Sequence, residues 1–391
     1  MPLARTAFPI GAQATVEELE RDPHPLLARL REHEPVSWLP ALDGWLVTRR
    51  DLALRAMRDP ALTVDDPRFS TAQVVGPSML SLDGAEHARH RRPFARPFRL
   101  DATRERFTAV VAEGSGRLVD AIAPAGRAEL RRTVAGPLAA AVTIHALGLA
   151  EADPAEVLGW YDAIVGSVSG IAAGRLATEG GRRGFVALRA AILTALDDDD
   201  RSSLVGAAVS DAGGLGRDEV VANAAVLLFG GIETTEGMIL NAVLHLLAHP
   251  DERALVAADP SLLPGAVEES LRLEPAAAVV DRYAVREVPL GDAVLGEREL
   301  VTVSIAGANR DPAVFAEPDR FDVRRANAGL HVAFAAGPHV CIGMHLARLE
   351  AHVAIGELLG RLPGLRLDPE HPAAPRGLVF RKPPALHVVW D

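Results

Sequence analysis

The only cysteine in the sequence, Cys341, lies in a short loop whose composition could support metal chemistry. Gly337 and Gly343 allow backbone conformations that a Cβ would forbid, and Pro338 fixes one backbone angle. Such a loop can point amide hydrogens at the sulfur, and the helical spacing of residues 344–352 places the thiol at a helix N-terminus. A thiolate stabilised in this way suits a soft metal or an iron porphyrin. The alternative for a lone cysteine is a small buried side chain.

A second polar cluster interrupts a long apolar segment. Residues 217–249 are apolar on nearly all sides, which is typical of a buried helix, and would extend about 45 Å. Gly230 and Gly231 each cost about 1 kcal/mol relative to alanine, so we expect compensation by a close ligand or by a local widening of the helix. Glu233 and Thr234 follow, and a buried carboxylate needs partners. A proton-transfer site and a polar cap on a core helix are equally supported by these residues alone.

Two further pairs have helical spacing. His87 and Arg91 are four residues apart and can bind two carboxylates on one helix face, although a solvated basic face is the simpler interpretation. Glu269 and Arg272 are three apart and can form an ion pair. Such pairs are common, so neither spacing is specific by itself.

Together these segments resemble the bacterial cytochrome P-450 family of haem-thiolate monooxygenases. The haem-binding signature of that family matches Phe334, Gly337, His339, Cys341 and Gly343. Ala335 is a departure, because the family often has glycine there. The long-helix motif of the family matches Gly230, Gly231, Glu233, Thr234 and Thr235, and its ion-pair motif matches Glu269 and Arg272. The order of these motifs is highly specific.

The resemblance implies a mainly α fold, the cytochrome P-450 fold, with small β-sheets and a long central helix over the haem. One domain, residues 1–391, would hold haem b (iron protoporphyrin IX), with Cys341 as the proximal metal ligand. The other residues implied to bind the cofactor are His87, Arg91, Arg282 and His339, at the propionates, and Phe334 and Gly343, in the loop.

The resemblance also assigns roles in catalysis and support. Thr234 would be the oxygen-side hydroxyl and Glu233 the acid that relays protons. A structural lock of Glu269, Arg272 and Arg320 would support the cysteine loop. The glycine-rich residues 166–184 would form a flexible lid. The substrate pocket would include Leu80, Phe229, Gly230, Val279 and Val379, whose apolar character indicates a hydrophobic small molecule.

The implied reaction inserts one oxygen atom from O2 into that molecule, with hydroxylation in bacterial secondary metabolism as the default. Electrons would come from NAD(P)H through a ferredoxin and its reductase, since the chain has no flavin or ferredoxin segment. Arg96 and Arg99 extend the basic surface expected to receive that acidic partner. A peroxygenase and a non-catalytic haem sensor are the alternatives. The Glu233–Thr234 pair disfavours the first, and the lid and apolar pocket disfavour the second.

Composition limits the other functional classes. The chain has 391 residues, 49% of them hydrophobic, so a large core is possible. Its net charge of -11 disfavours nucleic acid as a partner. No apolar run reaches the ~20 residues that span a bilayer, and the N-terminus lacks the apolar core of a signal peptide. We therefore expect a cytoplasmic monomer without membrane contact. The bias for arginine, with Lys382 the sole lysine, suggests GC-rich bacterial coding.

Overall fold

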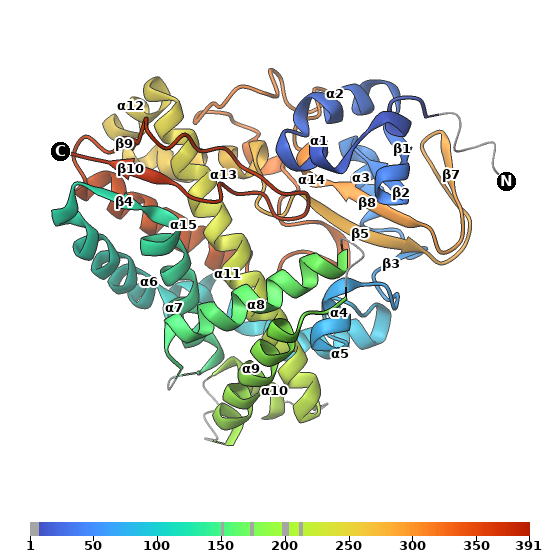
Figure 1. Ribbon diagram of the computed structural model, residues 1–391, viewed down its shortest axis with the longest axis horizontal. Helices are drawn as coiled ribbons and strands as arrows, with labels where there is room; N and C mark the ends of the chain where they lie inside the picture. Colours follow the sequence, from blue (N-terminus) through green and yellow to red (C-terminus); the bar gives the residue numbers. More distant parts are fainter. Residues whose placement is uncertain (1–7, 150–151, 173–175, 198–202, 211–213) are drawn as a thin grey trace.

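The computed structural model describes residues 8–149, 152–172, 176–197, 203–210 and 214–391. These residues form a mainly helical fold with small β-sheets at two opposite sides of the molecule (Figure 1). The predicted fold class is therefore confirmed. The helices of the first third are α1 (Val16–Arg21), α2 (His24–His33), α3 (Arg50–Ala56), α4 (Ser70–Val75), α5 (Gly84–Ala95) and α6 (Leu100–Ile122). The remaining helices are α7 (Gly136–Leu147), α8 (Pro154–Ala172), α9 (Glu179–Asp197), α10 (Leu204–Ser210), α11 (Arg217–Ala248), α12 (Pro250–Ala258), α13 (Leu263–Leu273), α14 (Ile305–Ala308) and α15 (Met344–Arg361).

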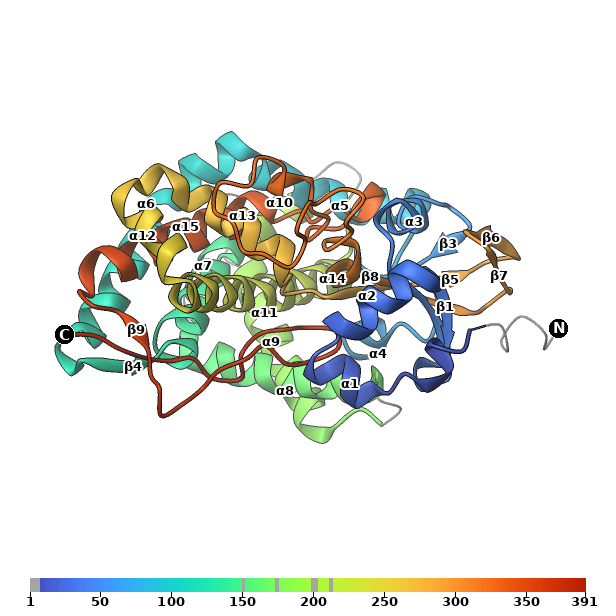
Figure 2. The same ribbon diagram turned by 90° about the horizontal axis from the view of Figure 1, so that it is seen from above.

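Helix α11 runs through the middle of the molecule, as both ribbon views show (Figures 1 and 2). It is long and apolar enough to cross a membrane, but 78% of its most apolar window is buried inside the protein. It remains one α-helix from end to end, without the local widening that was one of the two compensations expected for Gly230 and Gly231. The long central helix predicted from residues 217–249 is thus present.

The largest sheet has the strand order β1-β2-β8-β5-β3. Its strands are β1 (Val36–Leu39), β2 (Gly44–Val47), β3 (Leu62–Thr63), β5 (Val279–Ala284) and β8 (Leu300–Ser304). Asp43 adopts φ +46° before β2, so the expected turn joins β1 and β2 as an antiparallel pair. The smaller sheets contain β4 (Arg127–Glu129), β9 (Arg366–Leu367) and β10 (His387–Val389), and β6 (Val288–Leu290) and β7 (Ala293–Leu295).

The glycine-rich segment 166–184 differs from the flexible lid expected there. Most of it belongs to α8 and α9, while residues 173–175 lie outside the described residues. A Cβ at Gly181 would lie 2.4 Å from the Ser167 Cβ, and one at Gly184 would lie 2.9 Å from the Trp160 carbonyl oxygen. Gly181 and Gly184 therefore permit close packing of α9 on α8, whereas a Cβ at Gly166 or Gly180 would meet nothing within 4 Å.

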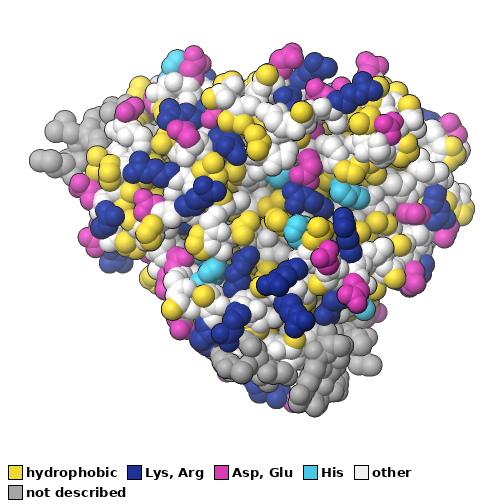
Figure 3. All heavy atoms as spheres, turned by 180° about the vertical axis from the view of Figure 1, so that it is seen from behind, with side chains coloured by type: hydrophobic (Ala, Val, Ile, Leu, Met, Phe, Trp, Pro, Cys, Tyr) yellow, Lys and Arg dark blue, Asp and Glu magenta, His cyan; other side chains and the backbone are white. Residues whose placement is uncertain are grey.

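Basic side chains gather around the middle and lower part of the face opposite to the first view, with histidines among them (Figure 3). Since the only lysine is buried, this surface is basic through its arginines. The charge distribution is therefore uneven despite the net charge of -11.

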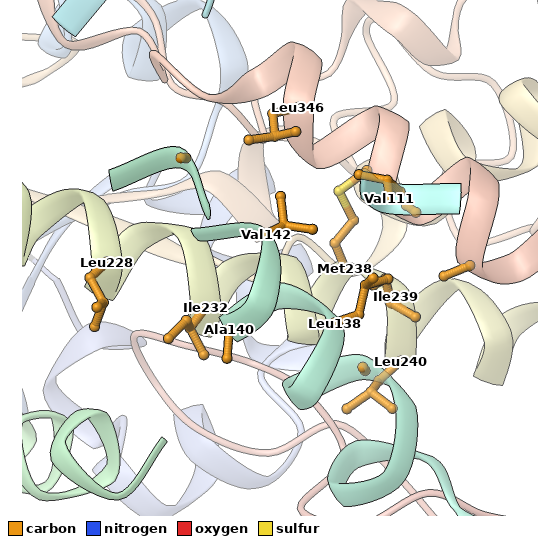
Figure 4. Packing of buried hydrophobic residues seen from close by; sticks show 14 of the residues in the cluster. Val111, Leu138, Ala140, Val142, Leu228, Ile232, Met238, Ile239, Leu240 and Leu346 are labelled. Carbon is orange, nitrogen blue, oxygen red and sulfur yellow. The ribbon is translucent and has the colours of Figure 1, made fainter. Parts of the chain in front are cut away.

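The main core surrounds α11. Leu138 and Val142 of α7 pack beside Ile232 and Met238 of α11, with Leu346 of α15 nearby (Figure 4). All of these side chains are buried. The core thereby fixes α11, which carries Gly230, Glu233 and Thr234, relative to α15, which begins directly after the cysteine loop.

Candidate active site

The cysteine loop is held by backbone hydrogen bonds and by left-handed residues. The amide of Cys341 donates to the carbonyl of Phe334 at 2.8 Å. Ala335 and Gly337 have φ values of +59° and +77°. A Cβ at Gly337 would lie 2.7 Å from the Met57 carbonyl oxygen, so glycine is required there for space as well as for conformation. The loop ends where α15 begins, which places Cys341 at the helix N-terminus as predicted.

The Cys341 thiol faces an internal cavity. The side chain is exposed to a water-sized probe and lines this cavity, although protein surrounds the residue on its other sides. Burial raises the pKa of Cys341, while a hydrogen bond from the Gly343 amide and the charges of Arg91 and Arg348 lower it in part. The loop amide and the two arginines therefore offset only part of the effect of burial on this thiol. A metal ion that deprotonates its thiol ligand directly would overcome the cost of burial.

The cavity has a volume of about 500 Å³ and is lined mainly by apolar side chains. It brings together α5, α7, α11, β5, the cysteine loop and the segment before β10. Its lining includes every residue predicted for the substrate pocket, namely Leu80, Phe229, Gly230, Val279 and Val379. Phe380, which follows Val379, adds an edge-to-face contact with Phe229 at a centroid distance of 5.3 Å.

Four basic residues predicted to bind the cofactor cluster at one part of this cavity. Arg91, Arg282 and His339 line it, and the His87 ring lies beside that of His339 in a tilted arrangement, at a centroid distance of 4.2 Å. Arg91 donates to the Val340 carbonyl at 2.6 Å, and Arg282 donates to the Asp281 carbonyl at 2.7 Å. Neither guanidinium forms an ion pair with a carboxylate of the described residues. Burial lowers the pKa of Arg91 and of Arg282.

The two histidines of this cluster differ in their hydrogen bonds. His339 Nε2 lies 2.7 Å from Asp83 Oδ1. Although burial opposes it, hydrogen bonds from His339 and Thr63 hold the pKa of Asp83 well below its usual range. His87 is buried, its Nε2 has no partner, and burial with nearby positive charge lowers its pKa to about 4.

This donor set fits an iron porphyrin. A cavity-facing thiol suits the metal, and the buried Arg282 and the partly buried Arg91, which have no carboxylate partner among the described residues, suit the anionic propionates. The unpartnered Nε2 of His87 adds a buried polar group that a bound carboxylate would satisfy.

The adjacent glycines Gly230 and Gly231 of α11 are required for different reasons. A Cβ at Gly231 would lie 2.6 Å from the Thr143 Oγ1 of α7, so this glycine permits helix packing. A Cβ at Gly230 would meet nothing within 4 Å, and Gly230 lines the cavity. The Thr234 hydroxyl also lines the cavity and donates to the Gly230 carbonyl at 2.6 Å. Gly230 therefore leaves space for a ligand, which was one of the two expected compensations.

Glu233 points elsewhere. It is 5% exposed and does not line the cavity. Its Oε1 lies 2.7 Å from Lys382 Nζ, on the segment before β10. Lys382 is conspicuous in the sequence as the only lysine. Composition alone could not, however, predict that it lies beside Glu233.

The structural lock contains a different third residue from the one expected. Arg272 pairs with Glu269 at 2.7 Å, and both side chains are fully buried, which agrees with the spacing. Arg325 Nε, not Arg320, contacts Glu269 Oε1 at 2.8 Å. Arg320 is exposed and pairs with Glu317 at 3.5 Å. The assignment of Arg320 was wrong because the chain turns after Phe321 and returns Arg325 to the carboxylate.

A second ion-pair network joins the same helix to the cysteine helix. Glu268 of α13 receives two hydrogen bonds from Arg348 of α15, at 2.6 and 2.8 Å. The Arg348 guanidinium lies 4.5 Å from the ring centroid of Phe334. Burial would raise the pKa of Glu268, but Arg348 and His331 lower it to about 2. This network fixes α15 and the loop together, and sequence spacing gave no sign of it.

The comparisons with known proteins agree on one family. The family model described as Cytochrome P450 matches residues 196–387. The chain is 36% identical to cytochrome P450 monooxygenase PikC of Streptomyces venezuelae, over 96% of this chain and 92% of that protein. It is 33% identical to 6-deoxyerythronolide B hydroxylase of Saccharopolyspora erythraea, over 96% of this chain and 99% of that protein. The crystal structure of CalO2 superposes with a TM-score of 0.87 at 28% sequence identity, over 96% of this chain and 99% of that protein.

Proposed function

The chain belongs to the cytochrome P450 family and is a monooxygenase, and from this premise we propose that it hydroxylates a hydrophobic small molecule with electrons from a ferredoxin and a ferredoxin reductase. Its relatives are haem enzymes of bacterial secondary metabolism, and the proposal places its own substrate there. The observation that carries the proposal is that Thr234 of α11 and the Cys341 thiol line the same largely apolar cavity.

We propose that Cys341 is the ligand of the haem iron, and that His87, Arg91, Arg282 and His339 hold the propionates. Bound there, the haem would supply oxygen activation, which a thiolate ligand favours by donating electron density. The protein supplies position and protons and excludes water from the cavity. Phe334 and Gly343 shape the loop on the cysteine side.

Thr234 is proposed to act as a hydrogen-bond acceptor. Its hydroxyl proton is directed to the Gly230 carbonyl, so the lone pairs of Oγ1 can accept a hydrogen bond from a protonated oxygen in the cavity. Glu233 is the adjacent acid that brings protons to this position. Since its carboxylate lies outside the cavity lining, delivery requires a rotation of the side chain or an intervening water.

The cavity wall supports a hydrophobic substrate. Leu80, Phe229, Val279 and Val379 supply apolar surface without a charge to pair. One relative is named for 6-deoxyerythronolide B, and this compound belongs in a screening panel. A compound that binds should shift the haem spectrum as bound water leaves the iron.

The basic face supports an acidic electron donor. Arginines gather over it (Figure 3), and α5 is followed directly by Arg96 and Arg99. An acidic ferredoxin would be attracted to such a surface, with a rate of association that falls as ionic strength rises. The proposal includes NADPH or NADH as the ultimate electron source and a monomeric enzyme.

The reconstituted reaction tests the proposal. Purified haem-loaded protein is incubated with the panel, NADPH and O2, with and without a surrogate ferredoxin and its reductase, and separately with hydrogen peroxide. We expect hydroxylated product only with the complete electron-transfer system. Product with peroxide alone would establish a peroxygenase, and binding without product in every mixture would favour a haem sensor.

A further inference from the structure

The sole lysine of the chain occupies an unusual place. Lys382 is only 9% exposed, which is rare for a lysine side chain. Its Nζ lies 2.7 Å from Glu233 Oε1 and 2.6 Å from Glu236 Oε1, so it bridges two carboxylates of α11. Neither contact has the angle of a good hydrogen bond, and both are therefore ion pairs by distance. Arg131 Nε lies 2.6 Å from the same Glu236 oxygen and completes the cluster.

Small residues make room for this cluster. A Cβ at Gly237 would lie 2.9 Å from Ala276 and 3.5 Å from the Lys382 Cβ, so the lysine stem passes over a glycine. A Cβ at Gly136 would lie 2.7 Å from Glu236 Oε2. Asn241 donates to the Arg381 carbonyl at 2.9 Å and fixes the neighbouring backbone to α11. The geometry around the ammonium is thus set by three elements, not by one flexible side chain.

The charges of the cluster balance. Glu233 and Glu236 contribute two negative charges, and Lys382 and Arg131 contribute two positive charges. Two further carboxylates lie near Arg131. The charge of Asp162 on α8 acts on its guanidinium, and Glu129 of β4 accepts a hydrogen bond from its backbone amide at 2.9 Å. Without Lys382, two buried carboxylates on one helix face would share a single cation, and protonation of one carboxylate is the least costly response.

Resting on the proposed function, we infer that Lys382 is a positioning residue of the oxygenase reaction, which keeps Glu233 ionised at rest and turned toward the segment before β10. An ionised acid can take up a proton from solvent and then release it toward Thr234, whereas an acid that is already protonated and stabilised in that form cannot cycle. The neighbouring Phe380 lines the substrate cavity, so the segment that carries Lys382 also contacts the space for the substrate.

The first test measures protonation and needs no turnover. Infrared difference spectra at neutral pH compare the haem-loaded wild type with Lys382→Met and Lys382→Gln. Two neutral variants are used so that the test still stands if one of them does not fold. Both should gain one absorption of a protonated carboxylic acid, and Lys382→Arg should gain none. Burial raises the pKa of Glu350 and of Asp281, but their absorptions are common to all variants and cancel in the difference.

The second test measures proton delivery without a known substrate. Two electrons and two protons reduce O2 to hydrogen peroxide, and four of each reduce it to two waters, so peroxide released per NADPH reports failed delivery. With a surrogate ferredoxin system and no substrate, Lys382→Met should raise this ratio roughly threefold, since a positioned proton donor is worth more than this. Arg89→Met is the matched control, because Arg89 also pairs with a carboxylate of α11, Glu219, and should leave the ratio unchanged.

The double variant Lys382→Met with Glu236→Gln separates charge from structure. It restores the balance between Arg131 and Glu233, so the new infrared absorption should disappear and the peroxide ratio should return to within twofold of wild type. A double variant as defective as Lys382→Met would overturn the inference, as would neutral variants without a new absorption. If wild type shows no oxygenase activity with any substrate, the proposed function fails, whereas the infrared result still decides the charge state of Glu233.

Discussion

Thr234 is the residue whose chemistry is most directly exposed to the cavity. We predict that Thr234→Ala continues to consume NADPH but releases more peroxide per NADPH, because the hydroxyl at the cavity surface is lost. Thr234→Ser retains a hydroxyl and should behave as wild type does. Parallel assays of NADPH consumption and peroxide decide the matter, and an unchanged ratio in the alanine variant would remove Thr234 from proton delivery.

Ala335 carries strain in the cysteine loop. Its φ of +59° is left-handed, which costs an L-residue about 1–2 kcal/mol. Ala335→Gly should therefore raise the free energy of unfolding by about 1 kcal/mol, measured by denaturant titration, after allowance for the greater freedom of glycine in the unfolded chain. The control is Ala336→Gly, where φ is -151° and glycine should destabilise. A loss of stability in both variants would contradict the assignment of strain.

At the residue scale, the sequence predicted which residues form the site better than it predicted where their side chains point. The family resemblance assigned Cys341, Thr234, Arg91 and Arg282 to one site, and all four line the same cavity. It did not reveal that Glu233 turns away toward Lys382, because that contact joins segments 149 positions apart (382 − 233). It also did not reveal the positive φ at Ala335, since the cost of a left-handed alanine is small enough to be offset by the rest of the loop.

At the scale of elements, the ion pairs around Glu269 of α13 allow Arg325 and Arg320 to be compared. Removing Arg325 would leave the fully buried Glu269 with less compensation, so Arg325→Met should lower the free energy of unfolding by about 3 kcal/mol. Arg320→Met should change it by less than about 0.5 kcal/mol, because its partner Glu317 is exposed. Equal losses in denaturant titrations of the two variants would restore Arg320 as a member of the lock.

His245 joins α11 to α13 and makes stability depend on pH. Its Nδ1 lies 2.9 Å from the Ser270 hydroxyl, and burial lowers its pKa to about 3. The folded protein therefore holds a neutral ring while the unfolded chain protonates near pH 6.5, so this contribution is complete above pH 6.5 and is lost as the pH falls toward 3.

The difference in unfolding free energy between wild type and His245→Gln should therefore fall by about 2 kcal/mol between pH 7 and pH 5. Glutamine keeps a polar contact with Ser270 but does not titrate, and denaturant titrations at each pH give the values. A difference that is constant with pH would show that the His245 ring is not held neutral.

Element patterns were informative where periodicity was strong. The apolar run of α11 and the turn before β2 were predictable. The segment 166–184 was not, because glycines that permit helix contact and glycines that permit flexibility have the same composition. The helix packing that distinguishes them is long-range. The same limitation applies to Arg325, whose return to Glu269 depends on a turn.

At the scale of the whole molecule, α11, α13 and α15 pack around one core and present the cavity to the segment before β10. A separate apolar cluster lies beneath the largest sheet. The organisation of residues 1–391 as one domain remains a prediction, as does the monomeric state. The arrangement explains why distant motifs can act together, since each is fixed to the same helices.

The central claim is that the Cys341 thiolate ligates haem iron in this cavity. The most direct measurement is the absorption spectrum of the purified, haem-loaded protein after reduction and exposure to carbon monoxide, beside that of Cys341→Ser. The wild type should show the red-shifted Soret band of a thiolate-ligated haem, and the serine variant should lack it. A wild-type protein without that band, or one that cannot be loaded with haemin, would contradict the claim.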